Sequence, residues 1–532
     1  MAMTRRIHKN DCVIFDTLES LVPQDHMVRK LEEAIDWEQI YDLVADLYSP
    51  IGRPSIDPVV LFKMIFINKV FGINSMRKTC EEIRVNIAYR WFLGLSIYDR
   101  VPNYSTWSQN YIRRYHDDPV FDKLFMIILE EADSQGFLDV GTVYGDGTHQ
   151  KASANRNRTE KKEVEVEARS YEEALLKEIN EVRAEHGKKE FDHTDREEKV
   201  FDEETGKEKL AVKTKTVSIS TTDSDCGIFH KGEHERCAAY ELQTFCDENG
   251  FVLAHDIVAG NVHDSVSFFP AYTKVEERFG SRIKNVCLDA GYKTPAICKE
   301  IIDNGKMPIL PYRRPMTKKG FFAKYNYSYD PEMDCYICPN GMRLKYSTTD
   351  RRGYSLYKSD PKDCAACPFA GKCTHSKNRQ KVVVRHVWEA YAEKAEETRH
   401  TDLHRNIYPK RKETIERVFA GSKENHCLRY TRVRGLEKNR VNSTMIFASH
   451  NLAKLARWKW KTREMNAVFD PNCGSFFTLI GHHIVKIINS GIVYLAKAPK
   501  KRQSAIKVTL YQQSETSNHL FFFVIKSMIK SI

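Results

Sequence analysis

YPKRKETIERVFAGSKENHCLRYTRVRGLEK, residues 408–438, is the segment around which the rest of the chain is organised. Ile415, Val418 and Phe419 recur at helical spacing among charged residues, which predicts an amphipathic helix from about Pro409 to Lys423. A solvated surface helix with no further role has the same pattern. This segment therefore needs partners elsewhere in the chain before it indicates a function.

The predicted helix carries Glu416, and Lys423 follows two turns later on the same face. A basic segment with an interleaved aromatic side chain comes next: Arg429, Tyr430, Arg432, Arg434 and Lys438. An acid on a rigid helix, followed by arginines, suits metal-dependent chemistry on a phosphate backbone.

The composition is that of a soluble globular protein with room for two to four domains. The chain has 532 residues, of which 41% are hydrophobic and 29% are charged. A formal net charge of +11 is a modest excess for this length, so it supports an acidic partner without identifying one.

Neither end of the chain predicts a membrane protein. The N-terminus, MAMTRRIHKNDCVIF, lacks the apolar run of a signal peptide. Residues 476–496 have the length of a membrane span, but His482, His483 and Lys486 interrupt them. We expect a cytoplasmic protein without a membrane partner.

Residues 20–135 have the apolar periodicity of several short helices. Asp57 followed by Pro58 predicts the start of one helix. Residues 102–116 predict another helix, which carries Arg113 and Arg114 as candidate DNA contacts. An ordinary helical bundle with solvated arginines remains the alternative.

Two aspartates follow short apolar strands in the middle of the chain. Asp146 lies in Gly-Asp-Gly-Thr after a predicted strand at 140–144, and the glycines would let a ligand approach the backbone. A turn aspartate between glycines is the plainer alternative. Residues 156–213 are dense in charge and predict a solvated helix and linker inserted at this point.

Asp289 follows the predicted buried strand 286–288 and precedes Ala-Gly-Tyr. Between the two aspartates, alternating apolar runs flank Asn249-Gly250, a strong hairpin signal. Strands alternate with helices from 250 to 312, which indicates an α/β domain whose ligands gather beyond the strand ends.

Fourteen cysteines in a chain without an export signal point to thiols or metal sites. Between 321 and 386 their spacing suits a tetrahedral zinc site, with reduced structural thiols as the alternative. The candidate ligands are Cys338, Cys364, Cys367 and Cys373. Cys335 and His375 are further candidates, since Cys335 forms a second CxxC pair with Cys338.

An aspartate after one strand, an aspartate after a later strand and a glutamate on a helix form an ordered constellation. Three converging carboxylates can hold two Mg²⁺ or Mn²⁺ ions roughly 4 Å apart. We therefore expect Asp146, Asp289 and Glu416 to share one metal site.

Over residues 20–460 the sequence resembles the DDE transposases of bacterial insertion sequences. The resemblance is to the branch with a helical N-terminal domain and a cysteine-containing insertion before the catalytic glutamate. The blocks that carry it are GRPSIDPVVLFKM (52–64), PNYSTWSQN (102–110), TTDSDCGIFHKG (221–232), GNVHDS (260–265), DAGY (289–292) and ETIERVF…K…LRYTRVRGL (413–436).

The resemblance implies an RNase-H-like catalytic core with Asp146, Asp289 and Glu416 as its catalytic acids. Related transposases often show a Tyr, Arg, Glu, Lys signature around the glutamate. Here its positions fall on Tyr408, Arg411, Glu416 and Lys423. One extra residue separates Arg411 from Glu416, so Lys412 fits the arginine spacing instead, and Glu413 is a rival acid that breaks the spacing to Lys423. Lys423 is then expected to contact a DNA phosphate. The further candidate DNA contacts are Tyr408, Arg411, Lys412, Arg429, Arg432 and Arg434.

The expected fold is α/β, with a mixed sheet flanked by helices. The expected divisions are 1–135 (helical DNA-binding domain), 136–320 (first part of the core, with the insertion 156–213), 321–386 (cysteine-rich insertion), 387–465 (end of the core) and 466–532 (tail without a defended structure). The resemblance also implies terminal inverted repeats and target DNA as partners, a homo-oligomer on DNA, and a bacterial, nucleoid-associated location.

Two other functions fit the same residues. A metal-dependent nuclease on this core would cut DNA without joining it. A non-catalytic protein that recognises DNA through a zinc-stapled segment would bind without any Mg²⁺-dependent cleavage.

Overall fold

The computed structural model describes residues 16–49, 51–52, 54–155, 157–202, 207–231, 235–314 and 317–468. The chain divides into two compact units, Met1–Lys459 and Trp460–Ile532. The first unit holds every described element except the end of the last helix. Most of the predicted tail 466–532, with the apolar run 476–496, lies outside the described residues. None of the helices in the described part combines the length and apolar character that a bilayer span requires.

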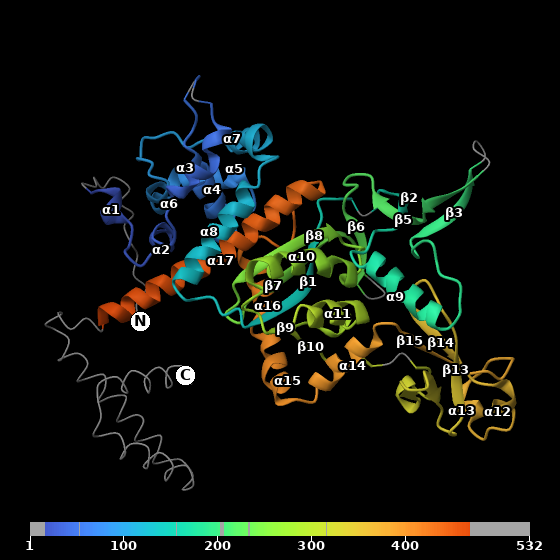
Figure 1. Ribbon diagram of the computed structural model, residues 1–532. Helices are drawn as coiled ribbons and strands as arrows, with labels where there is room; N and C mark the ends of the chain where they lie inside the picture. Colours follow the sequence, from blue (N-terminus) through green and yellow to red (C-terminus); the bar gives the residue numbers. More distant parts are fainter. Residues whose placement is uncertain are drawn as a thin grey trace, which may run out of the picture. The chain divides into compact units, whose positions relative to one another are not determined.

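The first part of the chain is helical, as predicted (Figure 1). Its elements are α1 (Leu18–Leu21), α2 (Met27–Glu32), α3 (Gln39–Val44), η1 (Ala45–Leu47), α4 (Pro58–Val70), α5 (Met76–Val85), α6 (Ile87–Phe92), α7 (Tyr104–Asn110), η2 (Tyr111–Tyr115) and α8 (Val120–Ser134). The predicted start of α4 is confirmed, because the Asp57 carboxylate accepts the N–H of Val59 at 2.7 Å.

A mixed sheet of six strands forms the centre of the first unit. Its strands are β1 (Thr142–Lys151), β6 (Gly227–Lys231), β7 (Glu235–Cys246), β8 (Val252–Ala259), β9 (Asn285–Cys287) and β10 (Met307–Ile309). They run in the order β10-β9-β1-β7-β6, and β8 also pairs with β7. β9 is parallel to β1 and β10, whereas β7 is antiparallel to its neighbours. The predicted hairpin is confirmed as β7–β8, and Gly250 takes the positive φ of +77° that its turn requires.

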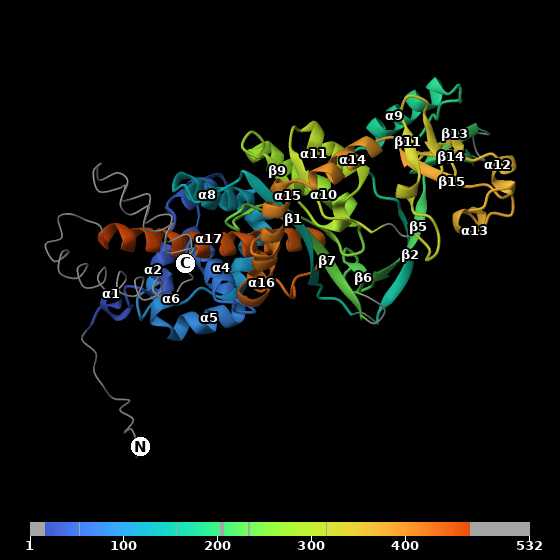
Figure 2. The same cartoon turned by 90° about the horizontal axis from the view of Figure 1, so that it is seen from below.

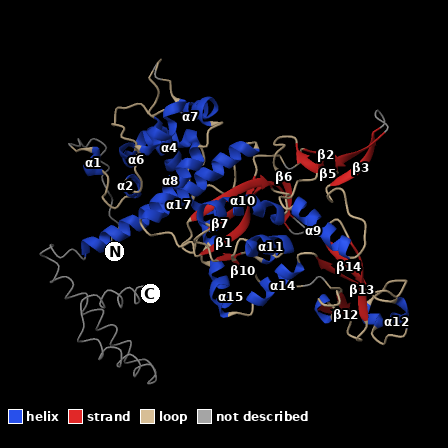
Figure 3. Ribbon diagram, viewed as in Figure 1, coloured by secondary structure: helices blue, strands red, loops and turns tan. Residues whose placement is uncertain are grey.

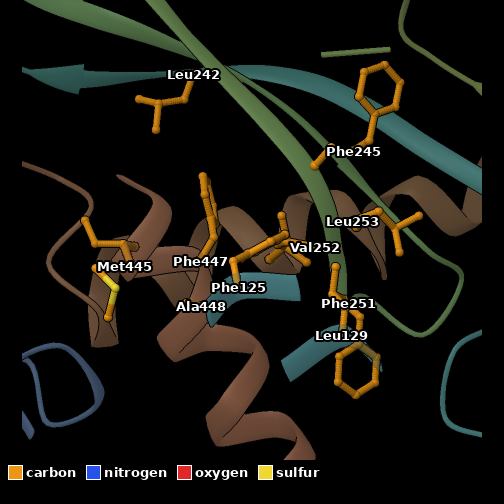
Figure 4. Close-up of a cluster of buried hydrophobic side chains, with 14 of the residues drawn as sticks. Phe125, Leu129, Leu242, Phe245, Phe251, Val252, Leu253, Met445, Phe447 and Ala448 are labelled. Atoms are coloured by element: carbon orange, nitrogen blue, oxygen red, sulfur yellow. The ribbon is translucent and has the colours of Figure 1, made fainter. Parts of the chain in front are cut away.

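Helices from both ends of the chain pack on this sheet. The later ones are α10 (Asp264–Phe279), η3 (Ala290–Tyr292), α11 (Pro295–Asp303), α14 (Glu389–Thr398), α15 (Asp402–Ile407), η5 (Tyr408–Lys412), α16 (Ile415–Asn425) and α17 (Leu436–Val468). Figure 4 shows apolar side chains of α8 and α17, such as Phe125 and Phe447, against Phe251 and Val252 of the β7–β8 hairpin. The N-terminal helices and the end of the core therefore share one apolar core.

The TTDSD block supports the start of α17. The Asp223 carboxylate accepts the N–H of Gly435 at 3.1 Å and also the hydroxyl of Tyr240. Asp225 accepts the N–H of Leu436 at 2.9 Å. Carboxylates at this position accept hydrogen bonds from the free N–H groups of the first helical turn, and their negative charge interacts favourably with the positive end of the helix dipole.

The charged segment 156–213 contains more structure than the predicted helix and linker. The helix is α9 (Glu172–Glu185). The strands are β2 (Thr159–Glu165), β3 (Glu197–Asp202), β4 (Lys207–Val212) and, just after the segment, β5 (Thr214–Ser220). β2 pairs with β5 and β3 pairs with β4. The prediction missed these strands because most of β2 is exposed on both faces, so the sequence carries no apolar alternation.

The cysteine-rich segment forms a separate antiparallel sheet, with its strands in red in Figure 3. It consists of η4 (Lys324–Asn326), β11 (Ser328–Asp330), β12 (Cys335–Ile337), β13 (Arg343–Thr349), β14 (Tyr354–Lys358), α12 (Pro361–Ala365), α13 (Ala370–Cys373) and β15 (Val382–His386). The five strands follow chain order across the sheet. We call this unit the cysteine sheet.

Candidate active site

Asp146 lies inside a strand, not at a strand end. β1 continues through Gly-Asp-Gly-Thr to Lys151 and pairs with β7 along this length, with Asp146 opposite Thr244. The sequence had predicted that the strand ends near Tyr144, and this is wrong. Glycine on both sides of Asp146 suggested a turn, but the ladder to β7 holds the segment extended.

The glycines beside Asp146 make room for the protein's own core, not for a ligand. A Cβ atom on Gly145 would lie 2.5 Å from Phe245 Cε1 and 2.6 Å from Leu288 Cδ2. A Cβ atom on Gly147 would lie 3.1 Å from the hydroxyl oxygen of Tyr292. Because side chains alternate along a strand, Asp146 projects from the opposite face of the sheet.

Asp289 follows the strand next to that of Asp146. β1 and β9 pair in parallel with Val143 opposite Val286 and Tyr144 opposite Cys287. The paired part of β9 ends at Cys287, two residues before Asp289. Asp289 lies near Asp146, because the charges of both aspartates act on the same Arg411 guanidinium. One Asp289 oxygen accepts the N–H of Gly291 at 2.7 Å and caps η3, which orients the carboxylate at the strand end.

Arg411 supplies the positive charge at this pair of acids. Its Nη2 lies 2.9 Å from Asp146 Oδ2, and its side chain is 8% exposed against 23% for Asp146. The approach is an ion pair without hydrogen-bond alignment, since Nη2 and Nε have no hydrogen-bond partner. The other Asp146 oxygen accepts the N–H of Gly147 at 2.9 Å.

The pKa of Arg411 reports how strongly this pocket favours a cation. Burial by itself lowers the pKa of the guanidinium, but the charges of Asp146, Asp289 and other nearby groups raise it above its usual value. The pocket is therefore negative enough to hold a buried cation. Arg411 had been expected to contact DNA; the structure instead places it inside, at Asp146.

Glu416 lies on the first turn of α16 with an exposed side chain. α16 packs against β1, the strand of Asp146, and the preceding η5 carries Arg411. Glu413, the rival acid, is exposed as well. Within the described residues, no three His, Cys, Asp or Glu side chains are grouped closely enough to hold a metal ion. The sharing of one site by all three acids thus stays a prediction.

The two aspartates alone are a donor set of the right chemistry for a hard cation. Mg²⁺ is commonly held by one or two carboxylates, with water and substrate phosphate oxygens completing its shell. Asp146 would supply one carboxylate from β1, and Asp289 the other from just after β9. Glu416 is an exposed acid on α16, the helix that packs against β1.

The basic segment after α16 is attached to the far end of β1. Lys151 N–H donates to the carbonyl of Arg429 at 3.2 Å, and Thr431 N–H donates to the carbonyl of Lys151 at 2.9 Å. Arg429 pairs with Glu424, whereas Arg432 is exposed. Arg434 donates to the carbonyl of Ser153 at 3.0 Å. The active-site strand and the basic segment therefore form one continuous edge.

This segment also lines a cleft of about 820 Å³ between the N-terminal helices and the start of α17. Figure 2 shows α16 beside α4 and α5. Direct contacts join the two sides: His426 Nδ1–H donates to the carbonyl of Lys69 at 3.0 Å, and Lys69 Nζ donates to Asn442 Oδ1 at 2.7 Å.

The cleft has the charge and the aromatic surface of a nucleic-acid site. Its basic lining side chains are Lys69, Lys423, Arg429, Arg432 and Lys438, and the acidic one is Glu424. Trp107, Tyr111 and Tyr430 also line it. Cationic groups beside aromatic rings are the combination that binds backbone phosphates and stacks bases.

Lys69 was not identified from the sequence. It lies in the strongly apolar helix α4, where a single lysine gives no signal by itself. Burial lowers its pKa to about 8. Only the fold, which brings α4 against residues 426–442, identifies it as a lining residue.

The other predicted DNA contacts lie in different surroundings. Lys412 is exposed, and the ring of Tyr408 stacks on His404 with centroids 5.1 Å apart. Arg113 is exposed on η2, whereas Arg114 lies over the ring of Tyr48 at 4.4 Å. Arg113 is therefore the freer of the two arginines to reach a phosphate.

Two families of known proteins match this chain. Residues 16–113 match the family described as Transposase domain (DUF772), and residues 337–456 match the family described as Transposase DDE domain. No curated protein matches the chain. The fold and site define an α/β protein with a mixed sheet and a pair of acids on neighbouring strands. The two matches support an insertion-sequence transposase of the DDE class, an enzyme that acts on DNA.

The matched regions cover different parts of the site. The N-terminal match contains α4 and Lys69, and the DDE match contains Glu416, Lys423 and the basic segment. Asp146 and Asp289 lie between the two matches, so their role depends on the geometry of β1 and β9.

Proposed function

We propose that this transposase binds the terminal inverted repeats of an insertion sequence and catalyses metal-dependent DNA cleavage and strand transfer. The observation that carries the proposal is the buried guanidinium of Arg411, which lies 2.9 Å from Asp146 and feels the charges of both Asp146 and Asp289. The pairing of β1 with β9, which ends two residues before Asp289, supports it. Two acids near one another are costly unless a positive charge balances them.

The strand order supports an RNase-H-like core. β1 is central, with the antiparallel hairpin β7–β8 on one side and the parallel strands β9 and β10 on the other. The two acids therefore come from the central strand and its parallel neighbour. The glutamate helix α16 packs against the same central strand.

Asp146, Asp289 and Glu416 are the residues we assign to two Mg²⁺ or Mn²⁺ ions. When bound, such ions activate the attacking water or 3′-hydroxyl and stabilise the leaving oxygen at phosphorus. The cap that Asp289 forms on η3 and the bond from Gly147 N–H to Asp146 fix both carboxylates beforehand.

Arg411 balances Asp146 in the structure without ions. Its buried guanidinium holds the Asp146 carboxylate in place, so this ligand is preformed when DNA arrives. We assign it this positioning role in place of DNA contact.

The cleft and the basic segment are the surfaces we assign to DNA. Lys423 and the exposed Arg432 would contact backbone phosphates, and Tyr430, which is 50% exposed, offers a ring for stacking. Arg113 and the other N-terminal basic side chains would add phosphate contacts along the terminal repeat. A homo-oligomer on DNA and a nucleoid location remain predictions.

The proposal is tested with Asp289→Asn on labelled DNA that carries the element's ends. The variant should lose roughly 10³-fold in cleavage rate, about 4 kcal/mol of transition-state stabilisation, because a metal ligand is removed. Binding to the ends should stay within about twofold, since the basic surfaces are unchanged. Cleavage near the wild-type rate would overturn the site.

Glu416 has a matched control in Glu413, an exposed acid one turn earlier. Glu416→Gln should abolish cleavage, whereas Glu413→Gln should leave it within about threefold. The reverse result would move the third acid to Glu413.

The same assay separates the alternative functions. Joined products on a supercoiled target identify a transposase, and cleavage without joining identifies a nuclease. End binding without any Mg²⁺-dependent cleavage would leave a DNA-binding protein that lacks catalysis.

A further inference from the structure

Residues 360–381 are held in place without an apolar core. All of them are described, and none is buried. The helices of this segment, α12 and α13, contribute no buried residue, and the large side chain of Phe369 is 39% exposed. Ordering a chain costs conformational entropy that apolar burial normally offsets, so another interaction is needed here.

The strands beside this segment have only a small core. Its buried members are Tyr327, Tyr336, Leu344, Tyr357 and Val383. Cys338 and Cys373 pack against it from the side of the segment. A core of this size does not extend over residues 360–381.

Four cysteines surround one small cavity between the sheet and this segment. Its volume is about 20 Å³, room for about one water-sized sphere. The four, which we call the cysteine tetrad, are Cys338, Cys364, Cys367 and Cys373. Cys364, Cys367 and Cys373 lie within one short segment, whereas Cys338 comes from the β12–β13 turn, so it is the fold that brings Cys338 to the other three.

Each local structure holds its cysteine backbone firmly. Cys338 lies in the β12–β13 turn, where its N–H donates to Met342 at 2.9 Å and its carbonyl accepts Gly341 N–H at 2.8 Å. Cys364 ends the first turn of α12, and Cys367 follows in the same turn structure. Cys373 is the last residue of α13.

The structure also removes the two extra candidates. Cys335 is buried in β12 but does not line the cavity. His375 does not line it either; its ring lies against Phe321 with centroids 4.6 Å apart. Four cysteines and the carboxylate residue Asp363 remain in the lining. We assign the four thiols as ligands, because a structural zinc site uses four and favours sulfur.

We propose that the cysteine tetrad binds one structural Zn²⁺ ion that fastens residues 360–381 to the cysteine sheet. The described side chains are not grouped at metal-binding distances, so binding has to bring the four sulfurs closer together. The thiols lose their protons to solvent on binding.

The surroundings suit the negative charge of a zinc tetrathiolate. Lys381 lines the cavity, and its Nζ donates to the carbonyl of Cys373 at 3.1 Å. The hydroxyl of Tyr327 lies 3.0 Å from Cys373 Sγ, and the Cys364 thiol donates to Ser359 Oγ at 3.1 Å. Once the thiols lose their protons, these hydroxyls can donate to the sulfurs, and such donors orient metal ligands and stabilise thiolates.

The test measures metal in the full-length protein purified under reducing conditions without added chelator. We expect about one zinc per chain, and Co²⁺ exchanged into the protein should give the intense visible absorption of a tetrahedral thiolate site. Cys364→Ser and Cys373→Ser should each lose most of the zinc. Protein that contains less than a tenth of a zinc per chain, or that holds the tetrad as disulfides, would overturn the proposal.

Cys335→Ala is the matched control, because it removes a buried cysteine of the same sheet that does not line the cavity. It should keep its zinc and the same Co²⁺ spectrum. Loss of zinc in this variant while its circular dichroism stays native would refute the assignment of the four ligands. Binding of end DNA by each variant shows that the rest of the chain is folded.

Discussion

The mixed sheet and the cysteine sheet differ in how much apolar packing surrounds their reactive side chains. In the mixed sheet, Asp146 lies on β1 and Asp289 follows β9, and residues close to them in sequence, such as Tyr144 and Leu288, are fully buried. In the cysteine sheet, the tetrad comes from turns and short helices around a core of five buried residues. Apolar packing alone holds the first region in place. In the second region the apolar core is too small to hold the loops that carry the tetrad.

This difference in packing predicts a catalytic role for metal in the mixed sheet and a structural role for metal in the cysteine sheet. Where apolar packing already fixes the backbone, a bound ion is free to serve the chemistry. Where packing is absent, the free energy of binding an ion becomes folding free energy. Removing metal should therefore abolish DNA cleavage at the mixed sheet without unfolding it, and should unfold part of the cysteine sheet.

The largest effect is expected from chelation. Stripping zinc should expose residues 360–381 to protease, because structural zinc contributes about 10 kcal/mol or more to the folding of small metal sites. Peptide mapping after limited proteolysis should find new cuts in that segment, while β1 and β9 stay protected. If residues 360–381 were equally protected from protease with and without chelator, zinc would not hold this segment in place and the two regions would not differ in their use of metal.

The next effect is expected from Arg411→Met, which leaves Asp146 and Asp289 without their buried cation. Breaking a buried pair typically costs several kcal/mol, so we expect a loss of about 3 kcal/mol in unfolding free energy. Mg²⁺ should restore more stability to the variant than to the wild type, since it no longer competes with the guanidinium. Urea unfolding with and without Mg²⁺ measures both.

Lys412→Met is the control for this variant, because Lys412 is the exposed neighbour. It should unfold like the wild type under both conditions. If Mg²⁺ stabilised Arg411→Met and the wild type equally, the two aspartates would not form the cation site.

Two glycines measure the packing difference directly. Gly145→Ala forces a Cβ atom to within 2.6 Å of two core side chains, so we expect a loss of about 1–3 kcal/mol. Gly371, in α13, has no atom within 4 Å of the Cβ it would gain, and Gly371→Ala should be neutral or slightly stabilising. Thermal unfolding compares them, and equal losses would mean that α13 is packed after all.

The sequence predicted the elements whose signals are local. The Asp57 cap, the Asn249-Gly250 hairpin and the buried strand before Asp289 each have a short pattern with one physical meaning. The helix of Glu416 is also present, but its predicted start near Pro409 is wrong: residues 408–412 form η5, and α16 begins at Ile415. The α/β class and the separate cysteine segment followed from these.

What the sequence could not provide depends on contacts between distant segments. β1 runs through Asp146 because β7 pairs with it, and a Gly-Asp-Gly pattern alone favours a turn. Arg411 is buried because it pairs with Asp146, a residue far away in the sequence. Lys69 lines the cleft only because the fold packs α4 against residues 426–442. The separation of Cys335 from the tetrad likewise needed the cavity.

A smaller effect is expected from the pH dependence of end binding. Because burial lowers the pKa of Lys69 to about 8, its charge is present at pH 7 and mostly absent at pH 9. The salt dependence of DNA binding, as log affinity against log salt, should therefore fall by about one unit between these pH values. Lys69→Arg should keep its charge and remove this change; a wild type with the same slope at both pH values would exclude Lys69 from the DNA interface.

The smallest effect concerns which of the two regions touches DNA. Lys423→Ala removes one phosphate contact in the cleft and should lower the salt slope by about one unit at pH 7. Lys345→Ala removes an exposed lysine from β13 of the cysteine sheet and should leave the slope unchanged. If Lys345→Ala changed the slope as much as Lys423→Ala, DNA would extend over the cysteine sheet. The zinc would then stabilise a DNA-binding surface, and the cysteine sheet would no longer have a purely structural role.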